Sequence, residues 1–353
     1  MGPGPWHLLR GIWRVVPGPF RPSVSTTLAE NRNIYECVIH QPGMMTVEER
    51  IRELCTEKNA VILAHNYQRP EVQAVADHVG DSFVLARRVS STDAEVIVFC
   101  GVDFMAESAK ILNPERTVIH PVVESRCPMA AMAEVELVRA LKSKHPDARV
   151  VSYINTSADV KAESDICCTS GNAVDVIRSI PEKKIIFVPD RNLGMYVQRS
   201  FPDKEIILWP GYCHVHQDDI TVQLIKEAKE KHPHGVVMAH PECTPEVIDM
   251  ADVVASTEGM IRHLRDVKEG TFIVGTEEGM IVRLQKENPN VTFIPVHGAL
   301  CPNMKRITLE SIARSLEEMG PTVQVDMEVA RKAKVALDRM LEVGRSAADE
   351  KKD

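Results

Sequence analysis

The stretch VILAHNYQRPEVQAVADHVGDS, residues 61–82, begins with four apolar residues that lead directly into His65, Asn66 and Tyr67. A short apolar run of this kind is typical of a buried β-strand, and the proline and the helical pattern that follow predict a helix. The stretch therefore predicts a strand that carries a histidine and a tyrosine at its carboxyl end.

The same arrangement recurs in VVSYINTSADVKAESDICCTS, residues 150–170, and in VVMAHPECTPEVIDMADVVAST, residues 236–257. Three sets of residues match between the stretches. In each set, the residue of the second stretch lies 88 positions after that of the first, and the residue of the third lies 87 positions further. These matching positions are His65, Tyr153 and His240; Tyr67, Asn155 and Glu242; and Ser82, Ser170 and Thr257. One shared period at independent positions indicates a triplicated unit.

A second strand, a helix and a third strand follow each opening, as in AEVIVFCGVDFMAESAKIL, residues 94–112, and RTVIHPVVESRCPMA, residues 116–130. Alternating strands and helices indicate βαβ units, and nearly all-apolar strands indicate parallel sheets with both faces covered. We therefore expect an α/β protein of three pseudo-threefold-related αβα domains. The expected domains are residues 44–130, 131–216 and 217–303, followed by C-terminal helices that pack on the core in 304–353, with a disordered tail from Ser346.

The bulk composition excludes several classes of protein. The 353 residues are 44% hydrophobic and 26% charged, with a formal net charge of -8. A net negative charge disfavours non-specific nucleic-acid binding and binding to anionic membrane surfaces, and no apolar run approaches the ~20 residues of a transmembrane helix.

Residues 1–43 are rich in proline, and their first part is basic. We interpret them as a disordered extension or an upstream translation start; a transit peptide is the alternative.

Each third strand is followed by a cysteine, namely Cys127, Cys213 or Cys301, at spacings of 86 and 88 residues. Nine scattered cysteines favour reduced thiols in the cytoplasm. Ligands bind at the carboxyl edge of open α/β sheets, so three domains around one axis would bring these cysteines together. Spacing alone leaves three interpretations open: packing cysteines, a zinc site completed by His216, and a [4Fe–4S] cluster with one iron that has no protein ligand.

Many longer motifs occur in one order along the chain, among them AHNYQRPEVQ, CGVDFMAESAKIL, SRCPMA, YINTSADVKAESD, GYCHVH, HPEC, ADVVASTEGM and HGALCPNM. Together they resemble the quinolinate synthase A family of de novo NAD biosynthesis over roughly residues 45–344. The resemblance implies three αβα domains around one [4Fe–4S] cluster per chain, held by Cys127, Cys213 and Cys301. It further implies a transferase that condenses iminoaspartate with dihydroxyacetone phosphate to quinolinate, releasing phosphate and two waters, with the cluster as a Lewis acid.

The same resemblance implies roles for the repeated residues. Tyr67, His240 and Glu242 match the acid–base residues of the family, and a place beside a cluster and anions predicts a raised pKa for Glu242. The residues implied to bind substrate are His65, Ser82, Tyr153, Asn155, Ser170, His216, Ser256 and Thr257. Of these, Ser82, Ser170 and Thr257 are expected at helix N-termini, which attract anions, with plain N-capping as the alternative.

The implied partners are the two substrates, an aspartate oxidase or dehydrogenase that supplies iminoaspartate, and the iron–sulfur assembly machinery. Neither a nucleic acid nor a membrane is expected as a partner. Two other functions stay open at this point. One is a non-catalytic metal or anion sensor on the same scaffold, and the other is a zinc hydrolase that uses Cys213 and His216.

Overall fold

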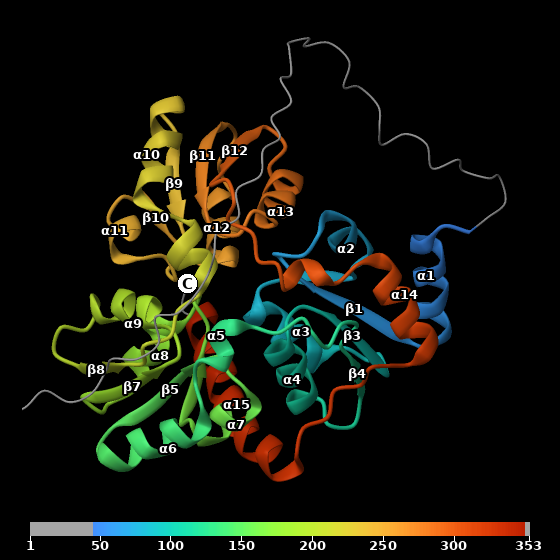
Figure 1. The fold of residues 1–353 in the computed structure, drawn as a ribbon, viewed down its shortest axis with the longest axis horizontal. Helices are drawn as coiled ribbons and strands as arrows, with labels where there is room; N and C mark the ends of the chain where they lie inside the picture. The colour runs from blue at the N-terminus through green and yellow to red at the C-terminus, as the bar shows by residue number, and fades with distance from the viewer. Residues whose placement is uncertain (1–44, 350–353) are drawn as a thin grey trace, which may run out of the picture. The chain divides into compact units, whose positions relative to one another are not determined.

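The computed structural model describes residues 45–349, which belong to one compact unit (Figure 1). The expected extension at residues 1–43 lies outside the described part of the chain. Three four-stranded sheets form within this unit, and all neighbouring strands in them are parallel. The predicted α/β class with three small parallel sheets is therefore confirmed, while the exact domain boundaries stay a prediction.

The first sheet has the strand order β2-β1-β3-β4. Its strands are β1 (Ala60–His65), β2 (His78–Gly80), β3 (Val96–Cys100) and β4 (Thr117–Ile119). Its helices are α1 (Val47–Glu57), α2 (Pro70–Val75), α3 (Ser82–Ser91), α4 (Asp103–Leu112) and α5 (Pro128–Ala131). Local signals explain two helix starts: Thr46 and Glu49 form a capping box before α1, and Pro70 takes the first position of α2, where a missing N–H costs nothing.

The second and third sheets repeat this strand order, as β6-β5-β7-β8 and β10-β9-β11-β12. The second contains β5 (Arg149–Tyr153), β6 (Ile166–Cys168), β7 (Lys184–Val188), β8 (Glu205–Leu208), α6 (Val135–Lys144), α7 (Ala158–Glu163), α8 (Ala173–Ser179), α9 (Arg191–Gln198) and a π-helix η1 (Val215–Asp219). The third contains β9 (Val236–Ala239), β10 (Val253–Val254), β11 (Gly270–Gly275), β12 (Val291–Pro295), α10 (Val222–Lys231), α11 (Pro245–Ile248), α12 (Thr257–Leu264) and α13 (Met280–Glu287).

The central pair of strands has the same register in every sheet. The last paired residues are Ala64 with Cys100, Ser152 with Val188, and Ala239 with Gly275. In each sheet the strand order reverses between these two strands, and open α/β sheets bind ligands at the carboxyl ends of such a pair. The repeated stretches therefore deliver His65, Tyr153 and His240 to three equivalent ligand-binding positions.

The first two sheets share one hydrophobic core, whereas the buried residues of the third sheet belong to other clusters. One cluster of buried residues includes Leu63 of β1, Val151 of β5 and Phe187 of β7. Buried residues of the third sheet, such as Ile273 and Phe272 of β11, belong to separate clusters. The third sheet therefore has a core of its own on each face.

The C-terminal helices return to the first two sheets. A 3-10 turn η2 (Met304–Arg306) leads into α14 (Leu309–Glu318), which packs on α1, and α15 (Met327–Asp349) packs on α7, β6 and α4 (Figure 1). The structure extends α15 as far as Asp349, past the expected start of a disordered tail at Ser346, and the tail itself stays a prediction. In the described part of the chain, no helix combines the length and apolarity that crossing a membrane requires.

Candidate active site

One cavity lies where the strand ends of the three sheets converge, and residues of all three repeats line it. Every site residue predicted from the sequence lines this cavity except Ser256. The lining residues from that prediction are His65, Tyr67, Ser82, Cys127, Tyr153, Asn155, Ser170, Cys213, His216, His240, Glu242, Thr257 and Cys301. The repeat period therefore selected residues that share one place in the fold, although they lie up to 236 positions apart in the chain.

The cysteines of the described residues fall into two groups. Cys127, Cys213 and Cys301 are partly exposed and line the cavity, whereas the other five are buried and do not line it. Burial raises the pKa of all three cavity thiols, so binding a metal group there would release protons. Three thiols facing one cavity, without a fourth from the described chain, fit a [4Fe–4S] cluster with one iron open to substrate.

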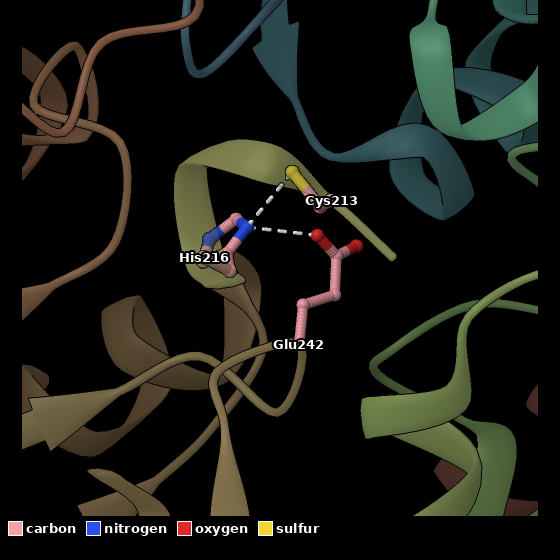
Figure 2. Close-up of side chains that lie close together, drawn as sticks. All are labelled: Cys213, His216 and Glu242. Atoms are coloured by element: carbon pink, nitrogen blue, oxygen red, sulfur yellow. Dashed lines mark hydrogen bonds and ion pairs between the residues drawn. The ribbon is translucent and has the colours of Figure 1, made fainter. Parts of the chain in front are cut away.

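Glu242 lies at the centre of the polar side chains. Its Oε1 accepts a hydrogen bond from the hydroxyl of Tyr153, and its Oε2 lies 2.8 Å from Nδ1 of His216. The same nitrogen lies 3.3 Å from Sγ of Cys213. Figure 2 marks the contacts of His216 with Cys213 and with Glu242 as dashed lines. His216 belongs to η1, and one-turn π-helices are frequent at functional sites. The Cys213–His216–Glu242 group could also hold a single metal ion, since its ligand atoms lie within 4.8 Å of one another.

The electrostatics of Glu242 differ from the expectation. Burial raises the pKa of this carboxyl, but His216, His240 and the hydrogen bond from Tyr153 outweigh burial and lower it to about 2. The pKa of Glu242 is therefore shifted in the direction opposite to the predicted one, because the sequence did not reveal how many donors surround the carboxylate. Burial and the nearby Glu242 charge raise the pKa of Tyr67 and Tyr153, so both phenols stay protonated as donors.

His65 and His240 share one local geometry. The Nδ1 atom of each accepts a hydrogen bond from the backbone N–H two residues later, from Tyr67 at 3.1 Å and from Glu242 at 3.4 Å. This places the proton of each neutral ring on Nε2. Burial lowers the pKa of both imidazoles to about 3, so they are neutral near pH 7. Nε2 of His240 can therefore donate to the hydroxyl of Ser170, 3.1 Å away.

The predicted helix-start residues are only partly placed as expected. Ser82 and Thr257 are the first residues of α3 and α12, but Ser170 lies before α8 begins at Ala173. The capping positions are held by their neighbours instead: Asp81 accepts from the N–H of Val84 over 2.8 Å, and Ser256 accepts from the N–H of Gly259 over 3.2 Å. Ser256 is thus the N-cap of α12, and its predicted role in substrate binding stays a prediction.

One lining side chain has an unsatisfied acceptor. Oδ1 of Asn155 is buried and accepts no hydrogen bond in the described structure. Leaving a buried polar atom unpaired is costly, so such atoms usually have a partner. Because Asn155 lines the cavity, a bound ligand with an N–H or O–H group would supply that partner.

Sequence reasoning missed Thr276, which joins two predicted site residues. Its hydroxyl lies 2.7 Å from Oη of Tyr67 and 2.9 Å from Nε2 of His216. Thr276 follows β11 directly, and the sheet registers align it with Gly101 and Pro189 of the other repeats. Since neither counterpart is polar, the repeat pattern carried no signal for it.

Known proteins of one family resemble this chain over most of its length. Residues 49–342 match the family model described as quinolinate synthetase A protein. The chain is 51% identical over 301 residues to a quinolinate synthase of Geobacter sp. (strain M21), which covers 85% of this chain and 98% of the relative. It is 53% identical over 293 residues to a quinolinate synthase of Desulforudis audaxviator, covering 82% and 96%. For quinolinate synthase 1 of Methanosarcina acetivorans the identity is 52% over 296 residues, covering 84% and 97%. The chain belongs to the quinolinate synthase A family.

Proposed function

We propose that this chain is a quinolinate synthase that condenses iminoaspartate with dihydroxyacetone phosphate to quinolinate, phosphate and two waters in the biosynthesis of NAD. One cavity carries the proposal. It is lined by three cysteines, which are the only ones in the described chain that are not buried, together with Glu242, His216 and Tyr153. The names of the relatives support the product. An aspartate oxidase or dehydrogenase would supply iminoaspartate, and the iron–sulfur assembly machinery would load the cluster, in the reducing cytoplasm.

Cys127, Cys213 and Cys301 would hold one [4Fe–4S] cluster per chain. When bound, the cluster supplies a Lewis acid that stabilises the charge developing on a departing hydroxide. His216 would then lie beside the substrate, since its ring already contacts both Cys213 and Glu242.

The acid–base work would fall to side chains whose protonation states differ. Condensation, isomerisation and loss of water all require proton transfers. Ionised Glu242 would accept a proton and the protonated phenol of Tyr67 would donate one, while the neutral ring of His240 would donate a hydrogen bond through its Nε2–H. These groups lie close together: the rings of His216 and His240 have centroids 4.7 Å apart, and those of Tyr67 and His216 6.3 Å.

Binding of the substrate carboxylates and phosphate would rest on hydroxyls, amides and backbone N–H groups. Ser82 and Thr257 begin α3 and α12, where free N–H groups and the helix dipole favour an anion. Further hydrogen-bond donors come from the side chains of Tyr153, Asn155, Ser170 and neutral His65. Oδ1 of Asn155 is a buried acceptor without a partner in the described structure. An acidic protein can bind anionic substrates in this way without a cluster of lysines.

Purification under anaerobic conditions tests the proposal. We expect about four irons and four sulfides per chain and quinolinate formation from the two substrates. Cys127→Ala, Cys213→Ala and Cys301→Ala should each abolish stable cluster binding. Cys100→Ala is the matched control, because Cys100 is a buried cysteine of the first sheet that does not line the cavity. Equal cluster loss in all four variants would refute the ligand assignment.

The Cys213–His216–Glu242 group favours one alternative, a zinc hydrolase, since its atoms lie close enough for a single ion. The same purification separates the alternatives. One zinc per chain, without iron, would indicate the hydrolase. An iron cluster without turnover of the two substrates would indicate a sensor on the same scaffold.

A further inference from the structure

One backbone hydrogen bond recurs in all three repeats and ties each cysteine loop to the end of a central strand. It runs from an N–H group just after the strand to the carbonyl of the residue two positions before the cysteine. The bonds, each 2.9 Å long, are Asp103 to Ser125, Arg191 to Gly211, and Glu278 to Ala299. The loops of Cys127, Cys213 and Cys301 therefore start from equivalent anchored positions.

Two repeats add a second bond, which holds the cysteine itself. Oδ1 of Asp103 accepts the backbone N–H of Cys127 over 3.0 Å, and Oε1 of Glu277 accepts the backbone N–H of Cys301 over 3.0 Å. Hydrogen bonds to an ionised carboxylate are stronger than neutral ones. A carboxylate two or three residues after a central strand thus restrains the cysteine backbone in the first and third repeats.

The second repeat has a carboxylate in the same region that does something else. Oδ1 of Asp190 accepts the N–H groups of Asn192 and Leu193, over 2.8 Å and 3.1 Å, and so caps α9. Its Oδ2 is buried and unpaired in the described structure. Cys213 is instead followed directly by η1 and contacts His216 through its sulfur. The three cysteines are therefore not held alike.

Glu277 is also connected to the acid–base residues. Its side chain is fully buried and pairs with Nζ of Lys305 at 2.9 Å. Nζ of Lys305 donates as well to the backbone carbonyl of Tyr67. A single buried carboxylate therefore joins the Cys301 loop of the third repeat to the Tyr67 loop of the first.

We propose that Asp103 and Glu277 are positioning residues, which hold the backbones of Cys127 and Cys301 so that the three cysteines can bind one cluster. This inference rests on the proposed function. Three thiolates on distant loops bind one cofactor only if their backbones are restrained, because ordering a loop costs conformational entropy. Glu277 additionally places Tyr67 relative to Cys301 through Lys305.

The test compares variants that separate the hydrogen bond from the charge. Asp103→Ala removes the acceptor, whereas Asp103→Asn keeps an acceptor oxygen and removes the charge; Glu277→Ala and Glu277→Gln form the same pair. Asp190→Ala is the matched control, because it removes a buried carboxylate of the same region whose bonds stay within α9. The Arg191–Gly211 backbone bond survives that change. All variants are loaded anaerobically, and iron per folded chain and the rate of chelator-driven loss of cluster absorbance are measured.

We expect cluster loss about ten- to hundredfold faster in Asp103→Ala and Glu277→Ala, and within about threefold of the parent chain in Asp103→Asn, Glu277→Gln and Asp190→Ala. Equal rates in all variants would overturn the inference while leaving the proposed function intact. If Asp190→Ala loses its cluster as fast as Asp103→Ala and Glu277→Ala, the inference would also be overturned, since the loss of a helix cap alone would then explain the faster cluster loss. A parent chain that binds no cluster would instead remove the proposed function. If Glu277→Ala fails to fold, the Asp103 pair decides the outcome.

Discussion

The Glu242 carboxylate of the third repeat accepts from the phenol of Tyr153 on one oxygen and contacts the imidazole of His216 on the other, so two residues of the second repeat set its chemistry. The repeat match and the family resemblance both singled it out, since a His-Pro-Glu sequence on a loop does not by itself indicate a function. Its low pKa keeps it ionised near pH 7, so it would accept a proton rather than donate one.

Glu242→Gln tests that role at a single residue. The amide keeps the size of the side chain but cannot take up a proton, so we expect kcat to fall about 10²-fold or more while the iron content stays unchanged. Steady-state kinetics and iron analysis measure the two quantities. Glu246→Gln, an exposed acid on the following helix, is the control and should keep full activity. An unchanged kcat in Glu242→Gln would remove it from the acid–base residues.

His65 makes stability depend on pH. Its pKa is about 3 in the folded chain against an ordinary value of 6.5, so the unfolded chain binds a proton that the folded chain does not between these values. Its contribution to the free energy of unfolding is therefore complete above about pH 6.5 and decreases by roughly 1.4 kcal/mol per pH unit as pH falls toward 3.

Urea unfolding of the cluster-free protein at several pH values from 7 to 4 would measure this slope. We expect His65→Gln to make the slope shallower by about one proton. His234→Gln, at an exposed histidine, should leave it as in the parent chain. Parallel pH profiles for all three proteins would contradict the buried, neutral state of His65.

At the scale of the elements, the residues that follow the strands form most of the candidate site, and the residues that begin helices add to it. The apolar runs predicted β1, β5 and β9 closely, because strands buried on both faces leave a strong sequence signal. The helix starts were harder, since Asp81, Asn172 and Ser256 compete with their neighbours for the capping position. Which residue caps depends on backbone angles that the sequence pattern does not reveal.

Ser256→Ala tests the separation between cap and ligand. Loss of the bond to the N–H of Gly259 should cost about 1 kcal/mol of stability. Because Ser256 does not line the cavity, KM for either substrate should change less than twofold. Ser256→Thr keeps the hydroxyl and is the control. Thermal unfolding and steady-state kinetics give both values, and a large rise in KM without a stability loss would restore Ser256 as a substrate ligand.

At the scale of the whole molecule, α15 holds the first two sheets together. It packs on α7 and β6 of the second sheet and on α4 of the first. Ala333, Ala336 and Leu337 of this helix are fully buried in the cluster that includes residues of both sheets. The third sheet connects to the first through polar side chains, for example Asn66 with Thr257 at 2.8 Å.

Leu337→Ala should therefore destabilise the described unit by about 2–5 kcal/mol, the range for a buried leucine that leaves a cavity. Val335→Ala, on the exposed side of the same helix, should cost far less. Urea unfolding measures both changes. Folded Leu337→Ala should still bind the cluster, because Leu337 does not line the cavity. Similar losses for the two variants would mean that α15 does not hold the core as described.

The amino-acid sequence alone was sufficient for the triplicated α/β architecture and for a set of residues that line one cavity, because the repeat period, the apolar strands and the strand-end residues are local signals that three copies reinforce. Only the tertiary structure decided the low pKa of Glu242, the role of Thr276 and the carboxylate bonds to Cys127 and Cys301. These depend on which side chains of different repeats meet in a buried cavity, where desolvation and hydrogen bonding are collective and no single stretch of sequence records them.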